Sequence, residues 1–431
     1  MALGEAATVL VEGFYLFFNY ARLIASRRLG LAIAATGCLL SGQGYAASEL
    51  TLSQALEQAQ SNNPNMAAAT WQVDISQAEH KQAGLIPNPE LSWEVEDTRS
   101  DTRTTTVQLT QPIELGGKRG ARVEFAERGI DIASLGLEQN RNALRADVIQ
   151  AFYGALQANM RFELAEESQG IAQRALTIAQ GRVQAGKVSP IELTRAQVQL
   201  AEIELEANRA RKDLGIAKAR LQLIMGHDGG QQVQPQGDAT RLPRLPSTLA
   251  LLNALSGSAE LRSAKSAVEQ QDASFELEKA QRIPDLNVSL GSQYSSADRE
   301  RVNVVGLSMP LPLFNRNQGN ILAAARRADQ SRDLRNATEL RLRNEVQSAA
   351  EQWLMAQAEI NAFQATILPS AQSAVESTAR GFEMGKFAFL DVLDAQRTLI
   401  QSRAQYIQAL TSATESWVLL ERVLGDISAI K

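Results

Sequence analysis

The sequence predicts a mainly α-helical protein with a membrane β-barrel, to which each chain contributes four strands and long helical hairpins. Three observations predict this fold class: one motif occurs twice at a constant offset, each copy contains two short segments of alternating polarity, and each copy contains a very long helical stretch. Alternation with period two is typical of strands, whereas apolar residues with period 3.6 indicate a helix. The 431 residues therefore form a repeat architecture rather than two or three globular domains.

The amino terminus has the features of a secretory signal peptide. Three arginines precede the apolar stretch 29–40, and small residues follow up to Ala47. A basic segment, an apolar segment and a small-residue cleavage site in this order direct a protein out of the cytoplasm. We predict that residues 1–46 are removed. Translation is expected to begin further downstream than the first methionine, because the apolar stretch 9–20 is an unusual prefix for a signal peptide.

Cys38 offers an alternative to simple cleavage. A cysteine after Thr36 and Gly37 resembles a lipoprotein processing site, at which the thiol would be acylated, although Ala35 replaces the leucine that usually begins that motif. We expect an ordinary cysteine that is removed with the signal peptide, and lipidation is the alternative. The mass of the mature amino terminus distinguishes the two.

The repeated motif spans residues 182–197 and occurs again at 381–396. A glycine, a lysine, an acidic residue, an alanine and a glutamine coincide at an offset of 199 residues, the distance from Gly186 to Gly385. We therefore predict a tandem duplication with a first repeat, a polar linker and a second repeat, at residues 47–230, 231–248 and 249–431.

Each repeat begins with a helical stretch that runs into a proline, over residues 53–82 and 249–281. Two alternating segments follow; in the first of them, Leu91, Trp93 and Val95 alternate with polar residues. Such segments form strands with one apolar and one polar face. The four predicted strands cover residues 89–98, 104–112, 284–291 and 301–310.

Two long helices complete each repeat, and they form an antiparallel hairpin. The predicted ranges are 120–186 and 190–225 in the first repeat, and 319–385 and 390–424 in the second. A helix as long as the first would extend about 100 Å. Pro369 in the second repeat aligns with Gly170 in the first, so we expect a kink or a tightened turn at this position of the long helix in both repeats.

Four strands of about ten residues can cross a bilayer when they are tilted, but four strands do not close into a barrel. In lipid, an open edge leaves backbone groups without partners, each at a cost of several kcal/mol. The chain must therefore form oligomers. Three copies give a twelve-stranded barrel, and cyclic symmetry arranges the hairpins into a matching α-helical tunnel. The predicted function is passive conduction through outer-membrane lipid.

The duplication, the two strand pairs and the segment 385–396 resemble the TolC-type outer-membrane efflux family, over nearly all of residues 50–425. The segments 87–96 and 111–119 resemble the CzcC branch, the outer-membrane components of cobalt, zinc and cadmium exporters of the RND type. This resemblance implies a homotrimer with a twelve-stranded barrel and a periplasmic tunnel. It also implies a periplasmic adaptor (membrane fusion protein) that connects the channel to a proton-driven RND pump in the inner membrane.

The resemblance implies two sets of site residues at the turns between the long helices. Acidic residues after the turns would narrow a periplasmic aperture, namely Asp391, Asp394 and Glu192. Turn residues would contact the adaptor, namely Gly186, Lys187, Gly385 and Lys386. Carboxylates from three chains would form a ring that favours cations. Both sets also have a purely local interpretation, because acids favour helix starts and a glycine followed by a lysine is typical of a helix end.

Composition argues against several other functions. The net charge of −5 gives no basic surface for nucleic acid. One cysteine and two histidines provide no Cys/His metal site, and no catalytic constellation is evident. We expect no enzyme activity, no cofactor and no resident metal, so that cargo selection would depend on the pump and the adaptor.

Two alternatives remain open. An outer-membrane factor for drugs or secreted proteins would have the same elements, because the tunnel itself need not recognise its cargo. A periplasmic coiled-coil adaptor also uses long hairpins, but it would lack the four alternating segments.

Overall fold

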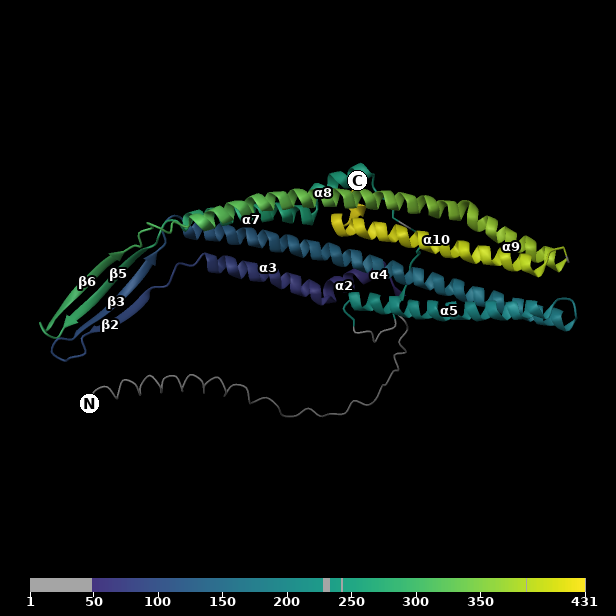
Figure 1. Cartoon of the computed structure of the whole chain (residues 1–431), viewed down its shortest axis with the longest axis horizontal. Helices are drawn as coiled ribbons and strands as arrows, with labels where there is room; N and C mark the ends of the chain where they lie inside the picture. Colours follow the sequence, from purple (N-terminus) through teal and green to yellow (C-terminus); the bar gives the residue numbers. More distant parts are fainter. Residues whose placement is uncertain (1–48, 228–232, 242, 385, 431) are drawn as a thin grey trace, which may run out of the picture. The chain divides into compact units, whose positions relative to one another are not determined.

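The computed structural model describes residues 49–227, 233–241, 243–384 and 386–430 (Figure 1). The predicted signal peptide, its Cys38 and the turn residue Gly385 lie outside the described residues. The chain divides into the units Met1–Ala46 and Ala47–Lys431. All elements named below belong to the second unit.

Long α-helices make up most of this unit. Those before residue 230 are α2, α3, α4 and α5, at Leu52–Asn62, Pro64–Ala83, Lys118–Gln184 and Pro190–Ile224. Those after it are α6, α7, α8, α9 and α10, at Thr248–Ala254, Ala259–Ala280, Gln318–Ala362, Leu368–Glu383 and Phe389–Leu424. Two 3-10 turns at Leu255–Gly257 and Ile427–Ala429 and a π-helical turn at Phe363–Ile367 accompany them. Within the described ranges, every helix is too short or too polar to span a bilayer.

Four strands form one antiparallel sheet in the order β2-β3-β5-β6. They lie at Glu90–Glu96, Thr104–Ile113, Leu286–Ser295 and Glu300–Ser308, close to the predicted ranges apart from small shifts at their ends. The structure adds a short parallel pair, β1 at Glu49–Leu50 with β4 at Gln234–Pro235, which the sequence did not predict. Two-residue strands are too short to show a period. The four-stranded sheet lies at one end of the helices (Figure 1).

The register gives this sheet two chemically different faces. One row across the four strands is entirely apolar, with Leu91, Leu109, Leu290 and Val305 side by side. The neighbouring rows on the opposite face contain glutamates, threonines, serines and glutamines. Side chains alternate between faces along a strand, so the apolar row and the polar rows face away from each other.

Both predicted stretches that open the repeats are helical, and each is divided into two α-helices. The side-chain oxygen of Asn63 accepts a hydrogen bond from the N–H of Asn65 at 2.8 Å, and Pro64 is the first residue of α3. The hydroxyl of Ser258 starts α7 by accepting from the N–H of Leu261 at 3.4 Å. Polar side chains at these positions satisfy the free N–H groups of a new helix.

The kink predicted for both repeats occurs in one of them. In the first repeat, α4 passes through Gly170 as a single helix of 67 residues, so that prediction is wrong. Glycine in a helix costs only about 1 kcal/mol, and the packing of α4 on both sides outweighs this cost. In the second repeat the π-helical turn precedes Pro369 directly. The turn is wider rather than tighter, which relieves the clash of the proline ring with the preceding turn.

The central helix is α4. Toward the sheet it packs against α3 and α7, and toward the opposite end it packs against α5 and α10 (Figure 1). In turn, α10 packs against α8 and α9. The main hydrophobic core forms where helices of both repeats meet, around Leu342, Trp353, Leu410 and Trp417. The largest hydrophobic core of the described residues therefore lies in the middle of the unit, between the sheet and the hairpin tips.

Candidate functional site at the helix tips

The first hairpin turns at residues 185–189. Gly186 has a φ of 66°, in the left-handed region that glycine adopts without strain. The N–H of Gly186 donates to the carbonyl of Val183 at 3.0 Å, and the N–H of Lys187 donates to the carbonyl of Arg182 at 2.9 Å. These bonds satisfy carbonyl groups at the end of α4. Gly186 therefore ends α4, and the side chain of Lys187 is exposed at the tip.

The second hairpin turns between α9 and α10, and the described residues of this turn bond back to the end of α9. The N–H of Lys386 donates to the carbonyl of Gly381 at 2.8 Å. The side chain of Lys386 is exposed, like that of Lys187. Each tip therefore presents one lysine to solvent.

The two returning helices start differently. Before α5, the hydroxyl of Ser189 accepts from the N–H of Ile191 at 3.3 Å. Ala388 has the same position before α10, and its side chain has no acceptor. The carboxylate of Asp391 reaches back and accepts from the N–H of Ala388 at 2.8 Å. Asp391 thus stabilises the start of α10, as an acidic group in the first helical turn is expected to do.

Two aromatic contacts hold the tips. The guanidinium of Arg182 lies over the ring of Phe382, 3.9 Å from its centroid, and so joins the end of α4 to the end of α9. The ring of Phe387 folds back onto α9 at Gly381, where an added Cβ would lie only 2.1 Å from a ring carbon. The absence of a side chain at Gly381 therefore makes room for Phe387.

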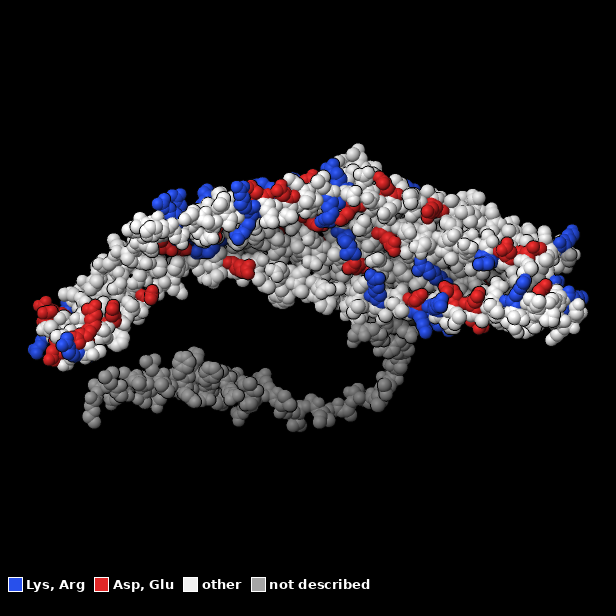
Figure 2. Space-filling model, viewed as in Figure 1, with Lys and Arg blue, Asp and Glu red and all other residues white. Residues whose placement is uncertain are grey.

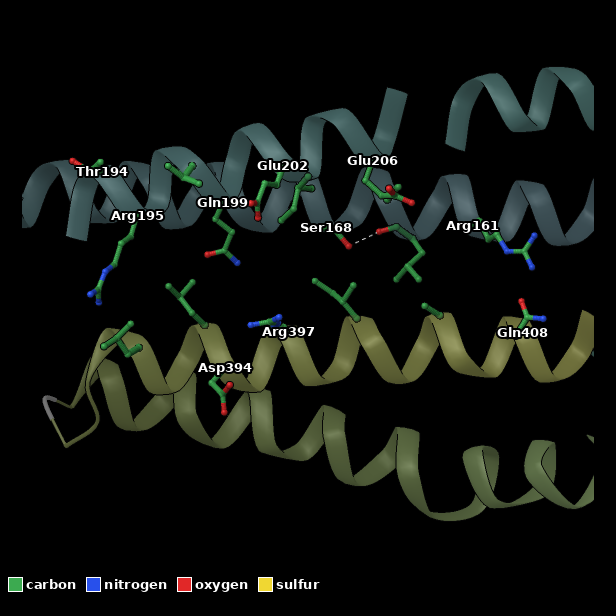
Figure 3. Close-up of a pocket in the computed structure, with 18 residues that line it drawn as sticks. Arg161, Ser168, Thr194, Arg195, Gln199, Glu202, Glu206, Asp394, Arg397 and Gln408 are labelled. Carbon is green, nitrogen blue, oxygen red and sulfur yellow. Dashed lines mark hydrogen bonds between the residues drawn. The ribbon is translucent and has the colours of Figure 1, made fainter. Parts of the chain in front are cut away.

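A groove of about 930 Å³ separates the α4–α5 hairpin from α10 beside these tips (Figure 3). Its apolar lining comes from all three helices and includes Leu164, Val198, Ile203, Leu390, Leu393 and Ile400. Charged side chains of both signs also line it. Among the described residues, the side chains of Arg195, Glu202 and Arg397 form no hydrogen bond or ion pair. In Figure 3, Arg195 and Gln199 on α5 extend toward α10, and Arg397 lies on the α10 wall of the groove. Such a surface suits an amphipathic polypeptide segment.

Polar contacts join α4 to α10 on the side of the groove away from the tips. The side chain of Gln157 donates to the hydroxyl of Thr414 at 3.0 Å, and Arg161 donates to Thr411 at 3.0 Å. Glu167 pairs with Arg403. Between Glu167 and the tips, no hydrogen bond or ion pair joins α10 to α4 or α5 among the residues that the structure describes. The tip half of α10 is therefore not joined to α4 or α5 by polar contacts in the described part of the chain, and it packs against α9 instead.

The residues predicted for the aperture have three different surroundings. Asp394 is exposed and lines the groove, Asp391 is exposed and bonded to the start of its own helix, and Glu192 is half-buried in the first turn of α5. One chain does not bring them into a ring. Of the residues predicted to contact the adaptor, Gly186, Lys187 and Lys386 lie at the two tips, and Gly385 is outside the described residues.

Sequence reasoning missed the contact between Arg182 and Phe382 and the charges of the groove. Arg182 stands four positions before Gly186, and Phe382 stands three positions before Gly385. These similar positions before the two glycine-lysine pairs were a usable signal. No comparable signal exists for Arg195 and Arg397, which come from different repeats. Across the described part of the chain, no three His, Cys, Asp or Glu side chains gather closely enough to hold a metal ion.

Comparison with known proteins gives the family. The sequence pattern of the outer membrane efflux protein family matches residues 55–227 and 250–426. The chain is 39% identical to the cobalt-zinc-cadmium resistance protein CzcC of Cupriavidus metallidurans over 380 residues, which cover 88% of this chain and 91% of that protein. It is 28% identical to the nickel-cobalt-cadmium resistance protein NccC of Alcaligenes xylosoxydans xylosoxydans, over 69% of this chain and 68% of that protein.

The fold is also that of a solved channel. The crystal structure of the Campylobacter jejuni CmeC outer membrane channel superimposes with a TM-score of 0.75 at 16% identity, over 92% of this chain and 94% of that one. The resemblance that the motifs indicate is thus confirmed for the sequence and for the fold. The chain belongs to the outer membrane efflux protein family.

Proposed function

We propose that this protein is the outer-membrane channel of a tripartite efflux system, and that it gives divalent heavy-metal cations a passive exit. The channel lies in the outer membrane of a Gram-negative bacterium, as its family does. The observation that carries the assignment is the four-stranded sheet, with one apolar and one polar face. Its edge strands β2 and β6 each have a single partner strand among the described residues.

Closure of this sheet requires further chains. The order β2-β3-β5-β6 alternates in direction, so β6 of one copy is antiparallel to β2 of the next. Three copies then form a closed barrel of twelve strands, in which the apolar faces contact lipid and the polar faces line the lumen. Closure removes every open edge.

The helices support the same assembly. Large apolar side chains are exposed on α5, including Ile191, Leu205, Ile216 and Leu223, and others are exposed on α8, including Leu334, Leu340 and Met355. The two helices lie at opposite ends of the packing order α5, α4, α10, α8. Apolar edges at both ends suit a ring in which each chain packs against the next, and this ring forms the helical tunnel.

The proposal includes the organisation of the chain. Residues 1–46 form a signal peptide that is removed, and residues 47–230 and 249–431 form two efflux repeats joined by the linker 231–248. The two matched segments of the family pattern, 55–227 and 250–426, support this division.

The hairpin tips contact a periplasmic adaptor, which connects the channel to an RND pump in the inner membrane. The exposed Lys187 and Lys386 mark the contact surface. Gly186 shapes the first turn, and Gly385 is proposed as a contact because it has the same place in the repeated motif. The groove between α5 and α10 provides a surface of mixed apolar and charged side chains beside the tips, suited to the hairpin helices of such a partner.

Asp391, Asp394 and Glu192 narrow the aperture at the tips when three chains assemble. All three carboxylates contribute negative charge to the aperture, and that of Asp391 is held in place by its hydrogen bond to the N–H of Ala388. Replacement of Asp391 and Asp394 by alanine should raise single-channel conductance in planar bilayers. An unchanged conductance in this double variant would remove both residues from the aperture.

Divalent cations of cobalt, zinc and cadmium are the proposed cargo, because the relative that is 39% identical is named for resistance to these metals. A deletion strain should become sensitive to the three metals, and the gene on a plasmid should restore growth. Sensitivity to drugs with unchanged metal tolerance would favour the alternative of a drug exporter. The channel is not an enzyme and requires no cofactor.

The trimer is tested directly by native mass spectrometry of the full chain extracted from outer membranes in detergent. A homotrimer is the expected mass. A soluble periplasmic protein would contradict the proposal and favour the alternative of a coiled-coil adaptor. Recovery of a lipid-modified Cys38 in the same experiment would show that the chain is anchored as a lipoprotein.

A further inference from the structure

We infer that the polar face of the strand sheet makes the outer-membrane part of the channel selective for cations, and that Glu90, Glu94, Glu96 and Glu300 determine this selectivity. The inference rests on the proposed trimeric channel. It adds a determinant of cargo charge at the end of the molecule opposite the hairpin tips, independent of Asp391 and Asp394.

The hydrogen-bonded register places the four glutamates on one face. Three rows of paired residues cross the sheet, and their members are Glu90, Thr110, Ser289 and Gly306; Glu94, Thr106, Gln293 and Val302; and Glu96, Thr104, Ser295 and Glu300. Paired residues on neighbouring strands point to the same side. All four glutamates therefore share the face opposite the apolar row that contains Leu91 and Val305.

No basic side chain accompanies them on this face. Arg301 is the one lysine or arginine within the four strands, and it pairs with Tyr294 in a row of the opposite face. Among the described residues, none of the four glutamates forms an ion pair or a side-chain hydrogen bond. In Figure 2, acidic atoms lie along the strand end of the molecule, and basic atoms gather toward its turns. The negative charge of the face is therefore not neutralised within the chain.

The glutamates occupy only the two edge strands, three on β2 and one on β6. When β6 of one copy pairs with β2 of the next, the carboxylates of both strands gather along each of the three seams. Carboxylates on a wall of low dielectric constant give the enclosed lumen a negative potential, which concentrates cations and excludes anions. A divalent cation has twice the energy of a monovalent one in this potential. The selectivity arises from the field of the whole wall and requires no ion bound at any one carboxylate.

Reversal potentials in planar bilayers test the inference. The trimer is measured in a gradient of dilute KCl, at about 10 mM, where the Debye length is roughly 30 Å and wall charges are poorly screened. The Asp391→Ala, Asp394→Ala background removes those two carboxylates at the tips as a source of selectivity. In this background, replacing the four glutamates with glutamine should lower the ratio of potassium to chloride permeability by roughly threefold or more.

Two further variants separate a charge effect from a structural one. Gln108→Glu with Gln293→Glu returns carboxylates to the same face on the central strands, and it should restore much of the lost selectivity. Gln108→Lys with Gln293→Lys leaves all four glutamates in place and should lower the cation preference by adding positive charge. This variant tests the inference even if the fourfold variant does not assemble.

The outcomes distinguish this inference from the function on which it rests. If the unaltered trimer forms no conducting channel, the proposed function itself is contradicted. If channels form and neither the glutamine variants nor the lysine variants change the permeability ratio, the channel assignment is retained and the inference is wrong.

Discussion

The guanidinium carbon of Arg182 lies 3.9 Å from the centre of the Phe382 ring, and this contact joins the last turn of α4 to the last turn of α9. The two residues belong to different repeats. No hydrogen bond or ion pair links α10 to α4 or α5 between Glu167 and the tips within the described ranges. The cation–π contact is therefore a cross-link between the two hairpins at the end of the molecule where they are otherwise separated by a groove.

Loss of this contact should loosen the tips. A cation–π pair at a partly exposed position contributes about 0.5–1 kcal/mol. This free energy is enough to change several-fold the ratio of joined to separated tips. Arg182→Ala should therefore raise the single-channel conductance of the reconstituted protein. The matched control is Arg174→Ala, which removes an exposed arginine from the same helix that forms no hydrogen bond or ion pair among the described residues. Equal conductance of the two variants would show that the contact does not restrain the tips.

Gly381 and Gly181 should respond differently to the same substitution. A Cβ at Gly381 would lie 2.1 Å from the ring of Phe387, whereas a Cβ at Gly181 would meet nothing within 4 Å. Gly381→Ala should displace Phe387, and Gly181→Ala should be neutral or slightly stabilising, since alanine favours a helix by about 1 kcal/mol. Hydrogen exchange of the Lys386 N–H, which donates to the Gly381 carbonyl, measures the effect. Protection of this amide in both variants would contradict the prediction.

The strands with regular alternation and the long helices could be predicted from the sequence. Alternation at Leu91, Trp93 and Val95 identifies β2 because one face of that strand is apolar and the other is not. The lengths of α4 and α10 follow from the absence of proline within them and from the glycines at their carboxyl ends, Gly186 and Gly425. In these segments, local preference and the final fold agree, which is typical of natural sequences.

The remaining features depend on contacts between distant segments. The π-helical turn lies where Gln364 donates to the hydroxyl of Tyr406 at 2.7 Å, a partner from another helix. The groove brings Glu202 and Arg397 to one opening from different repeats, and their approach depends on how α5 and α10 rotate about their axes. Aperture residues could be predicted only by resemblance, because a ring of carboxylates exists only between chains.

The turn between β2 and β3 should resist acid. The guanidinium of Arg99 donates to both carboxylate oxygens of Asp97, and the backbone N–H of Arg99 and the hydroxyl of Thr102 donate to the same carboxylate. The Arg99 guanidinium, followed by Thr102, lowers the pKa of Asp97 well below its usual range. Because the pKa of Asp97 is lower in the folded state, its contribution to folding stability is complete above about pH 4, where an unfolded aspartate is ionised. This contribution is lost only as the pH falls toward the pKa of the folded state.

Hydrogen exchange of the Arg99 N–H, which donates to Asp97, follows this transition after correction for the intrinsic effect of pH. Protection should persist as pH falls through about 4, the ordinary range of aspartate. In Arg99→Ala the pKa of Asp97 should return toward that range, so protection should be lost near pH 4. Loss of protection at the same pH in both proteins would contradict the role of Arg99.

Glu421 should be the most sensitive charged residue of the helical core. Its side chain is 1% exposed, and its carboxylate accepts from Arg145 at 2.6 Å and from the indole of Trp417 at 3.1 Å. Arg145→Met would leave a buried carboxylate without its cation, at a cost of about 3 kcal/mol. The melting temperature of the trimer in detergent should therefore fall clearly.

The next residue along α10 provides the matched control. Arg422 pairs with Asp147 at 2.6 Å, but both side chains are about two-fifths exposed, 42% and 41%. Because exposed pairs contribute at most about 1 kcal/mol, Arg422→Met should change the melting temperature far less than Arg145→Met. Combining Arg145→Met with Glu421→Leu removes both charges and should recover most of the lost stability. If the double variant melts as low as Arg145→Met, the loss comes from packing of the arginine rather than from the stranded carboxylate.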